Sequence, residues 1–528
     1  MIKNLLKILI SILFLLIIFI AYLAYFGVTT SKFNNVIKDQ VKKQNSNLDI
    51  DLKKVKLHLD FKNISIKIKT KNPKIIINNS VKIELNEISS NISISSYFQN
   101  KFAIKNLMIK SKNNEIKSYI NFFIHSNNSL QLILLNQILN GGFAQINLDL
   151  NFDESGNILN NYNLTGQVSN AQVKLPKNII LKKINFNFYV KKDNFKFEKI
   201  FFKFNEINFN SDFLDIKEKN DKFFVKGNLK NKKNKITDNI IFLIFSDYLK
   251  NFDYSESKFE SISEFTFDLN KKYKIKNLKI NSKLNLDELF LKYESAKIKN
   301  YIKNYDNVIN LKENKLNIKY SNEKFLVDGS SELYIDKNNK NFIQFQIEKS
   351  KKKVDFETNL NLKNLGFEVQ DIAYTKFKKD KATLKIKGSI NNKKLFLKSI
   401  NYDERNNKIE INNLEIKNNK ISNIDKIKLD YLTINNFKNQ ISLNKKGANY
   451  ELIGESFDSI QLIENISNSE DDDNFFENFE NLNSKIKILI KEIKLDDKNS
   501  VINLKGNLEI KNNKIFDLNL NSNFNNNE

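Results

Sequence analysis

The sequence has no cysteine and no tryptophan, and among its 528 residues only two are proline, twelve are glycine and two are histidine. Without cysteine the chain forms no disulfide and has no thiolate chemistry. Scarce proline and glycine leave no segment with the composition of a flexible linker, and the same Lys-, Asn- and Ile-rich composition continues from about Asp49 to the end. We therefore expect one continuous architecture from 49 to 528.

Arginine is almost absent as well. The formal net charge is +25, but among 86 basic residues only Arg405 is arginine. Arginine is the residue suited to bidentate contacts with phosphate and guanine, so we expect no nucleic-acid partner. Lysine-rich, Asn-rich composition is also what an AT-rich genome encodes. A basic exterior would still attract anionic lipid head groups.

Motifs of catalysis are missing too. The histidines, His58 and His125, are far apart in the sequence, and no nucleophile elbow, zinc-binding helix, phosphate loop or dinucleotide fingerprint is found. The acidic run Glu470 to Asp473 lacks the glycine that a calcium loop needs at its sixth position. We expect no enzyme activity, no cofactor and no metal, and a solvated loop at the acidic run.

One long apolar run stands at the start of the chain. No residue between Lys7 and Lys32 is charged, and the segment Ile8 to Phe26 is long enough to cross a bilayer as a helix. It is longer than the apolar core of a signal peptide, and no A-x-A cleavage site follows. We expect a single transmembrane anchor over 8–28, with residues 1–7 on the cytoplasmic side.

Behind the anchor the periodicity changes twice. Apolar residues at helical spacing (Phe33, Val36, Ile37 and Val41) predict that the membrane helix continues as a short stalk over 29–48. From Val55 onward, apolar residues alternate with polar ones, which predicts strands with one apolar and one polar face. The alternating sets include Val55, Leu57, Leu59 and Phe61; Ile64, Ile66 and Ile68; Val81, Ile83 and Leu85; Ile184, Phe186, Phe188 and Val190; Phe195 and Phe197; Phe202 and Phe204; and Ile502 and Leu504.

Asn- and Lys-rich clusters separate these strands, as expected for the turns of a meander of local hairpins. A loose unit, apolar-x-Asn-[Leu/Phe]-x-apolar, recurs at irregular spacing. Its copies run from Ile104 to Ile109, from Ile275 to Ile280, from Leu362 to Phe367 and from Ile411 to Ile416. Three segments read as helices that cover part of the sheet: Ser129 to Leu139, Thr237 to Phe252, and Ser456 to Ile466, with Thr237 and Ser456 as N-caps.

These patterns predict a mainly β protein, in which an N-terminal transmembrane helix precedes an elongated, curled, antiparallel-rich sheet with a few short helices. About 30 strands, each with one apolar face, cannot close into a small barrel. Two arrangements of the apolar face remain. It lines an open groove, or facing sheets fill the space with their own side chains. The side chains expected to line a groove are Ile184, Phe186, Phe188, Val190, Phe202 and Phe204.

An anchor, a stalk and hundreds of residues of I-x-N-L-x-I strands resemble the AsmA-like family, which includes TamB and YhdP. The resemblance implies an inner-membrane protein of Gram-negative bacteria, with its N-terminus cytoplasmic and its bulk periplasmic. It also implies a β-groove that carries phospholipid between the two membranes and serves envelope lipid homeostasis and outer-membrane biogenesis. The expected partners are phospholipid acyl chains and the inner membrane. The alternatives are a TamB-type factor for assembly of outer-membrane proteins, which would bind polypeptide at strand edges, and a structural envelope spacer.

Overall fold

The structure is a computed structural model of the whole chain. It describes residues 2–44, 46–78, 81–126, 130–175, 179–220, 222–235, 252–253, 257–270, 272, 274–321, 323–336, 338–392, 394–468, 476 and 478–524. Two units are distinguished. Unit 1 comprises Met1–Lys232 and Glu264–Asn277, and unit 2 comprises Lys233–Ser263 and Leu278–Glu528. Each is described by itself.

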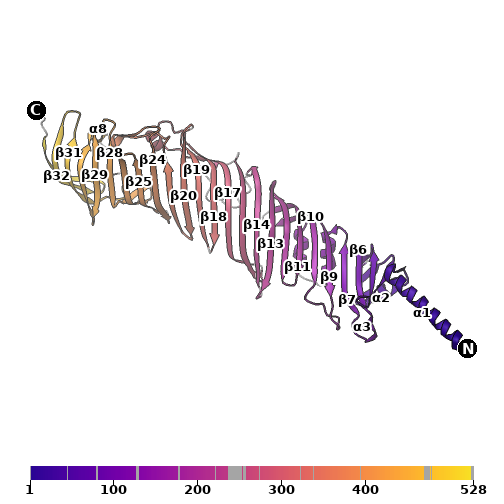
Figure 1. Ribbon diagram of the computed structural model, residues 1–528. Coiled ribbons are helices and arrows are strands. Elements are labelled where there is room, and N and C mark those ends of the chain that lie inside the picture. The colour runs from indigo at the N-terminus through magenta and orange to yellow at the C-terminus, as the bar shows by residue number, and fades with distance from the viewer. Residues whose placement is uncertain are drawn as a thin grey trace. The chain divides into compact units, whose positions relative to one another are not determined.

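Unit 1 begins with the long helix α1 (Ile2–Tyr25), which projects from the first strands (Figure 1). Its stretch Lys7–Tyr25 is long and apolar enough to span a membrane, and none of it is buried. The helix does not continue into a stalk. Gly27 has a φ of +69°, strand β1 (Val28–Thr30) pairs with β3 (Val55–Asp60), and a separate helix α2 (Asn34–Gln44) follows. The expected stalk therefore contains a strand that belongs to the sheet.

The remaining strands of unit 1 pair with near neighbours in the chain. A run of antiparallel pairs joins β3, β4, β6, β7, β9, β10, β11, β12, β13 and β14, and β2 and β5 form a branch on β6. Their bounds are β2 Leu48–Asp51, β4 Ser65–Lys71, β5 Lys74–Ile77, β6 Val81–Ser93, β7 Ile104–Ser111, β8 Asn114–Glu115, β9 Phe143–Asn151, β10 Asn163–Leu175, β11 Ile179–Lys191, β12 Asn194–Phe204, β13 Ile207–Lys219 and β14 Lys222–Lys235.

Helices α3 (Ile94–Phe98), α4 (Ile116–Ser126) and α5 (Leu130–Ile138) also belong to unit 1. The α5 helix confirms the expectation for Ser129 to Leu139, apart from Ser129, which lies outside the described residues. The α4 helix was not expected, because its sequence was not separated from the strands on either side of it.

Unit 2 repeats the same plan. Antiparallel pairs join β17, β18, β19, β20, β21, β24, β25, β26, β28, β29 and β30, then β31 pairs in parallel with β30, and β32 and β33 follow antiparallel. The bounds are β17 Ile275–Lys292, β18 Val308–Ser321, β19 Lys324–Tyr334, β20 Lys340–Ser350, β21 Lys353–Asn361, β24 Ala382–Asn391, β25 Lys394–Glu404, β26 Asn407–Lys417, β27 Lys420–Asn423, β28 Lys426–Leu432, β29 Lys438–Lys446, β30 Asn449–Asp458, β31 Ser484–Lys494, β32 Ser500–Lys511 and β33 Lys514–Phe524.

A small separate sheet pairs β22 (Phe367–Val369) with β23 (Tyr374–Lys376), and the 3-10 turn η2 (Gln370–Ile372) joins these two strands. The remaining elements are β15 (Phe252–Asp253), β16 (Lys258–Asn270), α7 (Ala296–Tyr301) and α8 (Ile460–Asn468). Strands β14, β16 and β17 contribute residues to both units.

The mainly β fold is confirmed, with 65% of the chain in strands and 13% in helices. The prediction that the third helix begins at Ser456 is wrong. Ser456 lies in β30, where its hydroxyl donates to Lys438 O (2.6 Å), and α8 begins at Ile460, whose N–H donates to Asp458 Oδ1 (3.3 Å). The helix expected from Thr237 to Phe252 lies almost wholly outside the described residues; its last residue, Phe252, is in β15.

Candidate functional site: the apolar face of the sheet

The six side chains predicted to line a groove lie on one face of β11 and β12. Ile184, Phe186, Phe188 and Val190 alternate along β11, and Phe188 pairs with Phe197 of β12. A bulge at Lys199, where φ is +52°, shifts the alternation by one residue, so that Phe202 and Phe204 return to the same face. The structure therefore brings the predicted residues together.

This face continues through neighbouring strands of unit 1 by directly opposed apolar pairs. These pairs include Leu107↔Leu150, Ile109↔Leu148, Leu148↔Leu164, Ala144↔Val168, Val168↔Phe186, Ala171↔Ile184, Val190↔Phe195, Phe197↔Leu214 and Phe202↔Phe209. The rings of Phe186 and Phe197 meet edge to face, with centroids 5.6 Å apart. The phenylalanines thus form one connected apolar surface.

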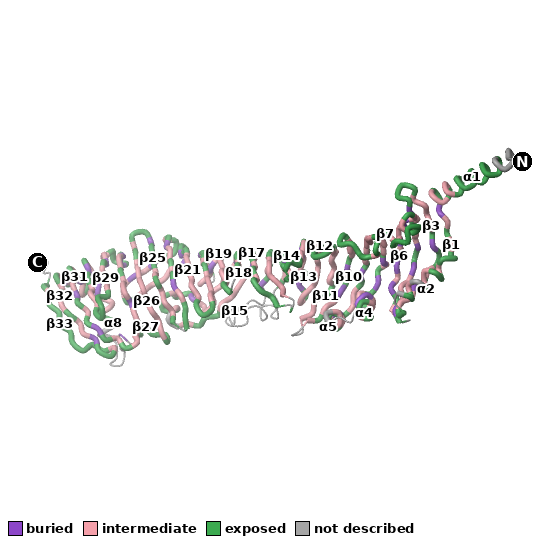
Figure 2. Tube along the Cα trace, turned by 90° about the horizontal axis from the view of Figure 1, so that it is seen from below, coloured by how far each residue is buried: buried purple, intermediate pink, exposed green. Residues whose placement is uncertain are grey.

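All six predicted residues remain partly exposed. Most residues of β11 and β12 are of intermediate exposure, which is pink in Figure 2. Ile184, Phe186 and Phe188 pack against a buried cluster, whereas Phe202 and Phe204 are not part of it. A sheet packed face to face against a second sheet would bury such residues fully. At β11 and β12 the apolar face is therefore not fully buried by other described parts of the chain.

Helices α4 and α5 cover another part of this face. Tyr119 and Ile120 of α4 and Leu139, which follows α5, are buried together with Leu85 and Val168 of the sheet. This cover lies over β6, β9 and β10, and Phe186 and Phe188 contact its border. Unit 1 therefore has a covered stretch beside an open one.

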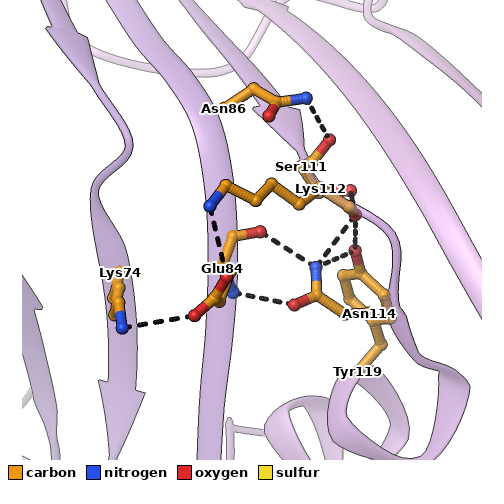
Figure 3. A network of polar contacts seen from close by, with 7 residues as sticks. All are labelled: Lys74, Glu84, Asn86, Ser111, Lys112, Asn114 and Tyr119. Atoms are coloured by element: carbon orange, nitrogen blue, oxygen red, sulfur yellow. Dashed lines mark hydrogen bonds and ion pairs between the residues drawn. The ribbon is translucent and has the colours of Figure 1, made fainter.

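A polar network fastens α4 to the sheet (Figure 3). The Asn114 side chain accepts a hydrogen bond from Glu84 N–H (2.8 Å) and donates to Glu84 O (2.9 Å) and to the Tyr119 hydroxyl (2.9 Å). Lys74 and Lys112 pair with the Glu84 carboxylate at 3.2 and 3.3 Å, and these two ammonium groups lower the pKa of that carboxyl. The Asn114, Tyr119 and Glu84 groups satisfy one another, so the network has a structural role.

In unit 2 the apolar face extends from β17 to β33. The opposed residues include Leu284↔Leu316, Ile318↔Val327, Val327↔Ile347, Ile347↔Phe356, Ile386↔Ile400, Ile400↔Ile411, Ile411↔Ile427, Ile427↔Leu443, Leu443↔Leu452, Leu452↔Ile488, Ile486↔Leu508 and Leu508↔Leu518. Phenylalanine rings contact glycines directly opposite them, Phe345 over Gly329 and Phe356 over Gly388. A methyl group at Gly329 would collide with the Phe345 ring, and one at Gly388 would collide with the Phe396 carbonyl oxygen, so both positions favour glycine.

The opposite face of the sheet is polar. Opposed lysine and glutamate side chains form ion pairs across it: Lys387 with Glu357 (3.0 Å), Lys487 with Glu451 (3.5 Å) and Lys485 with Glu509 (3.4 Å). These pairs are solvent-exposed and contribute little to stability. They place opposite charges next to each other on the polar face.

A hairpin made by β22, η2 and β23 covers the apolar face over part of unit 2. Tyr374 is fully buried against Tyr402 and Tyr431, and Leu362 and Leu365 are 4% and 3% exposed. The Tyr374 hydroxyl bonds to Tyr402 Oη (2.8 Å) and to the buried Glu404 carboxylate, while Tyr431 Oη donates to Ile372 O (2.6 Å). The hairpin is thus fixed by polar bonds inside an apolar cluster.

Lys376, the last residue of β23 in this hairpin, is also buried, at 1% exposed. Its ammonium donates to the carbonyl oxygens of Leu365 (2.8 Å) and Phe377 (3.0 Å), and burial lowers the pKa of the group. These carbonyls solvate the charge that water would otherwise solvate. We call residues Leu362–Asp380, with their tyrosine contacts, the hairpin cover.

In the part of the chain that the structure describes, no group of three or more His, Asp or Glu side chains is arranged to hold a metal ion. His58 lies in β3 and His125 in α4, where its Nδ1 is 2.6 Å from Asn121 O. The whole acidic run Glu470 to Asp473 lies outside the described residues. A recess beside Asp287 is lined by two lysines and by three acidic residues, Asp287 included, and Lys233 pairs with Asp287 at 2.7 Å.

No protein-family model, no curated protein and no solved structure matches this chain. Among the features of the face, sequence reasoning missed α4 and the hairpin cover. The hairpin cover had one signal, the segment Leu362 to Phe367, where the recurring unit contains Gly366 and the strand alternation ends.

Proposed function

We propose that the protein is a membrane-anchored carrier of phospholipid, with acyl chains held against the apolar face of the sheet and head groups left in water. One observation supports this proposal above the others. The face is apolar along successive strands, yet Phe186, Phe202 and Phe204 remain partly exposed. A partly exposed apolar surface on successive strands is unusual on a protein that has no ligand or partner.

The energetics suit an acyl chain. Each methylene group moved from water to an apolar surface contributes about 0.8 kcal/mol, so a carrier competes with the bilayer only where its face is apolar without interruption. The cross-strand pairs of β9 to β13 meet this condition, because their charged side chains lie on the other face. Transfer along the face then needs no chemical step, which agrees with a role that is not enzymatic.

The anchor and the family resemblance supply the rest of the proposal. Helix α1 is apolar and long enough for a single membrane span. The chain resembles AsmA-like proteins, and on that basis we propose that α1 lies in the inner membrane of a Gram-negative bacterium, with residues 1–7 cytoplasmic and the sheet periplasmic. The lipid would then be envelope phospholipid, moved between the inner and outer membranes.

The decisive experiment is photo-crosslinking of the full chain in cells, with benzoylphenylalanine at position 186 or at position 187. We expect a phospholipid adduct, identified by mass spectrometry, from position 186 and none from position 187. These neighbours in β11 point to opposite faces of one strand, so Asn187 is a matched control for expression, membrane insertion and crosslinker reactivity.

Equal labelling at the two positions would contradict the assignment of the faces, and absence of lipid at both would contradict lipid carriage. The full chain is required because β1 and β2 both pair within the sheet. A fragment that starts at Asp49 would lose β1 and the first residue of β2.

A second function has one observation in its favour. Strand β33 pairs with β32, and among the described strands none pairs with its other edge. Phe516, Leu518 and Leu520 of β33 are 63%, 52% and 44% exposed. An open strand edge with apolar side chains can receive another strand, as a TamB-type assembly factor would require. Crosslinking from position 518 to polypeptide, with no lipid at position 186, would favour this function.

A further inference from the structure

Exposed apolar side chains continue past the end of α1. Tyr25, the last residue of α1, and Phe26 are 83% and 66% exposed. Phe33, just before α2, and Val36 in its first turn are 45% and 57% exposed. Phe33 and Val36 are three positions apart, so they share one side of the helix. These apolar residues come within a few positions of the end of the membrane span, so they lie at the level of the bilayer surface.

Contacts on the opposite side of α2 fix the direction in which this apolar side points. Asn34 Nδ2 donates to Leu52 O (2.8 Å) and Lys53 O (3.1 Å), and the Lys38 ammonium pairs with Asp49 at 3.2 Å. These contacts hold one side of α2 against β2 and the segment that follows it. Phe33 and Val36 are therefore turned away from the sheet.

The end of α1 is itself fastened to the sheet. Gly27 N–H donates to Tyr22 O (3.2 Å) as the helix ends, and Gly27 lies so close to Leu57 O that a side chain there would collide with it. Strand β1 then pairs with β3 from Val28↔Leu57 to Thr30↔Val55. No flexible segment separates the membrane span from β3, so the first strands and α2 lie close to the bilayer.

Charge near α2 is mainly positive. Exposed lysines flank the apolar pair, with Lys32 just before the helix and Lys43 in its last turn, and Lys53 and Lys54 follow β2. Lysine side chains close to a membrane surface are attracted by anionic head groups. A helix with an exposed apolar side flanked by lysines is typical of helices that lie in the membrane interface.

We propose that α2 lies in the interface of the bilayer crossed by α1, with Phe33 and Val36 in the boundary between head groups and acyl chains and with Lys32 and Lys43 on anionic phosphates. The proposal rests on insertion of α1 and not on lipid carriage. Its consequence is that β1, β2 and β3 are seated on the membrane, so the sheet starts at the surface from which a lipid would leave.

The absence of tryptophan makes a direct test possible, because one introduced tryptophan is the only one in the protein. Phe33→Trp and Asn35→Trp place it on opposite sides of α2, both at exposed positions. The full chain is reconstituted in phosphatidylcholine vesicles that contain brominated acyl chains, with or without phosphatidylglycerol. We expect strong quenching and a blue-shifted emission for Phe33→Trp, and neither effect for Asn35→Trp.

Val36→Trp, on the same side as Phe33, is a second reporter if Phe33→Trp does not insert. Absence of quenching at both positions 33 and 36, or equal quenching at position 35, would overturn the proposal. Phosphatidylglycerol should increase the quenching of Phe33→Trp, and Lys32→Gln with Lys43→Gln should abolish that increase. No effect of phosphatidylglycerol would overturn the role of the lysines. Crosslinking at position 186 tests lipid carriage independently, so the two proposals can fail separately.

Discussion

Single residues in the left-handed region of the backbone shape the strands. Each of these residues interrupts the alternation of a strand. The residue two positions before it is apolar, and the residue directly after it is apolar in all cases but one. They are Asn170, Lys183, Lys199, Asn277, Glu313, Asn413 and Asn503, with φ between +50° and +56°. Each of these bulge residues is one extra residue in its strand. Without it, the regular alternation of side chains would place the following apolar residues on the polar face.

Valine at one of these positions should be costly. Asn503→Val places a β-branched side chain at a φ of +56°, and we expect a loss of about 1–2 kcal/mol in the free energy of unfolding, measured by urea denaturation. Asn507→Val is the control, because Asn507 is exposed in the same strand without a left-handed backbone. Equal losses for the two variants would show that burial and packing, not backbone conformation, decide the outcome.

The bulges explain what the sequence could and could not reveal at this scale. The recurring apolar-x-Asn unit is a true signal at Asn277 and Asn413, where asparagine tolerates the left-handed conformation. At Lys183, Lys199 and Glu313 the same conformation is adopted by residues that do not favour it. No residue type occurs only at bulges. The sequence therefore shows where the apolar alternation shifts, but it does not show that a left-handed residue causes the shift.

At the scale of elements, the hairpin cover gives the protein a buried group of tyrosines. Burial is the main cause that raises the pKa of Tyr374, Tyr402 and Tyr431, and hydrogen bonding to Glu404 adds to the effect at Tyr374. The native state thus holds these protons at a pH where the unfolded chain has released them. Their contribution to stability is complete below about pH 10 and is lost as the pH rises above it.

We therefore expect the urea concentration at the unfolding midpoint of unit 2 to decrease as the pH is raised from about 9 to about 11. The decrease should be smaller in a variant with Tyr374→Phe and Tyr431→Phe. Lys376 has the opposite effect on the pH dependence of stability, because its pKa is lowered in the native state. Stability increases with pH as this lysine loses its charge in the unfolded chain. Tyr189→Phe, at an exposed tyrosine, is the control and should leave the pH dependence unchanged. The same slope in the double variant and in the wild type would contradict the assignment.

The elements also divide into those that the sequence predicts and those that it does not. Strands on the open face were predicted because their alternation depends only on which side meets water. The α4 helix and the hairpin cover were not, because what fixes them is packing of their apolar residues on strands distant in the sequence. The six groove residues were correctly assigned to one face, but the contact of Phe186 and Phe188 with a helical cover depends on tertiary packing.

At the scale of the whole molecule, each unit combines open and covered stretches of its apolar face. In unit 2, Phe345 and Ile347 are partly exposed outside the buried cluster, whereas Leu384, Ile409 and Leu429 pack against the hairpin cover. An acyl chain and the hairpin cannot occupy the same surface. The hairpin cover therefore limits where on unit 2 a lipid could bind.

Benzoylphenylalanine at position 345 should capture phospholipid, and at position 429 it should capture only the protein itself. Intact mass after proteolysis distinguishes the two outcomes, since lipid adds its own mass and an internal crosslink joins two peptides. Position 346, on the polar face of β20, is the matched control for position 345. Lipid captured at position 429 would mean that the hairpin leaves the face in solution.

Successive pairing of strands has a further consequence, for how the protein is made. Nearly every described strand pairs with one that precedes it by a short loop, so loop closure is local and each new hairpin adds to a completed edge. Folding from β3 onward then proceeds strand by strand as the chain is synthesised. The parallel pairing of β31 with β30 needs α8 and the residues after it to be synthesised first, so we expect strand addition to slow at this step.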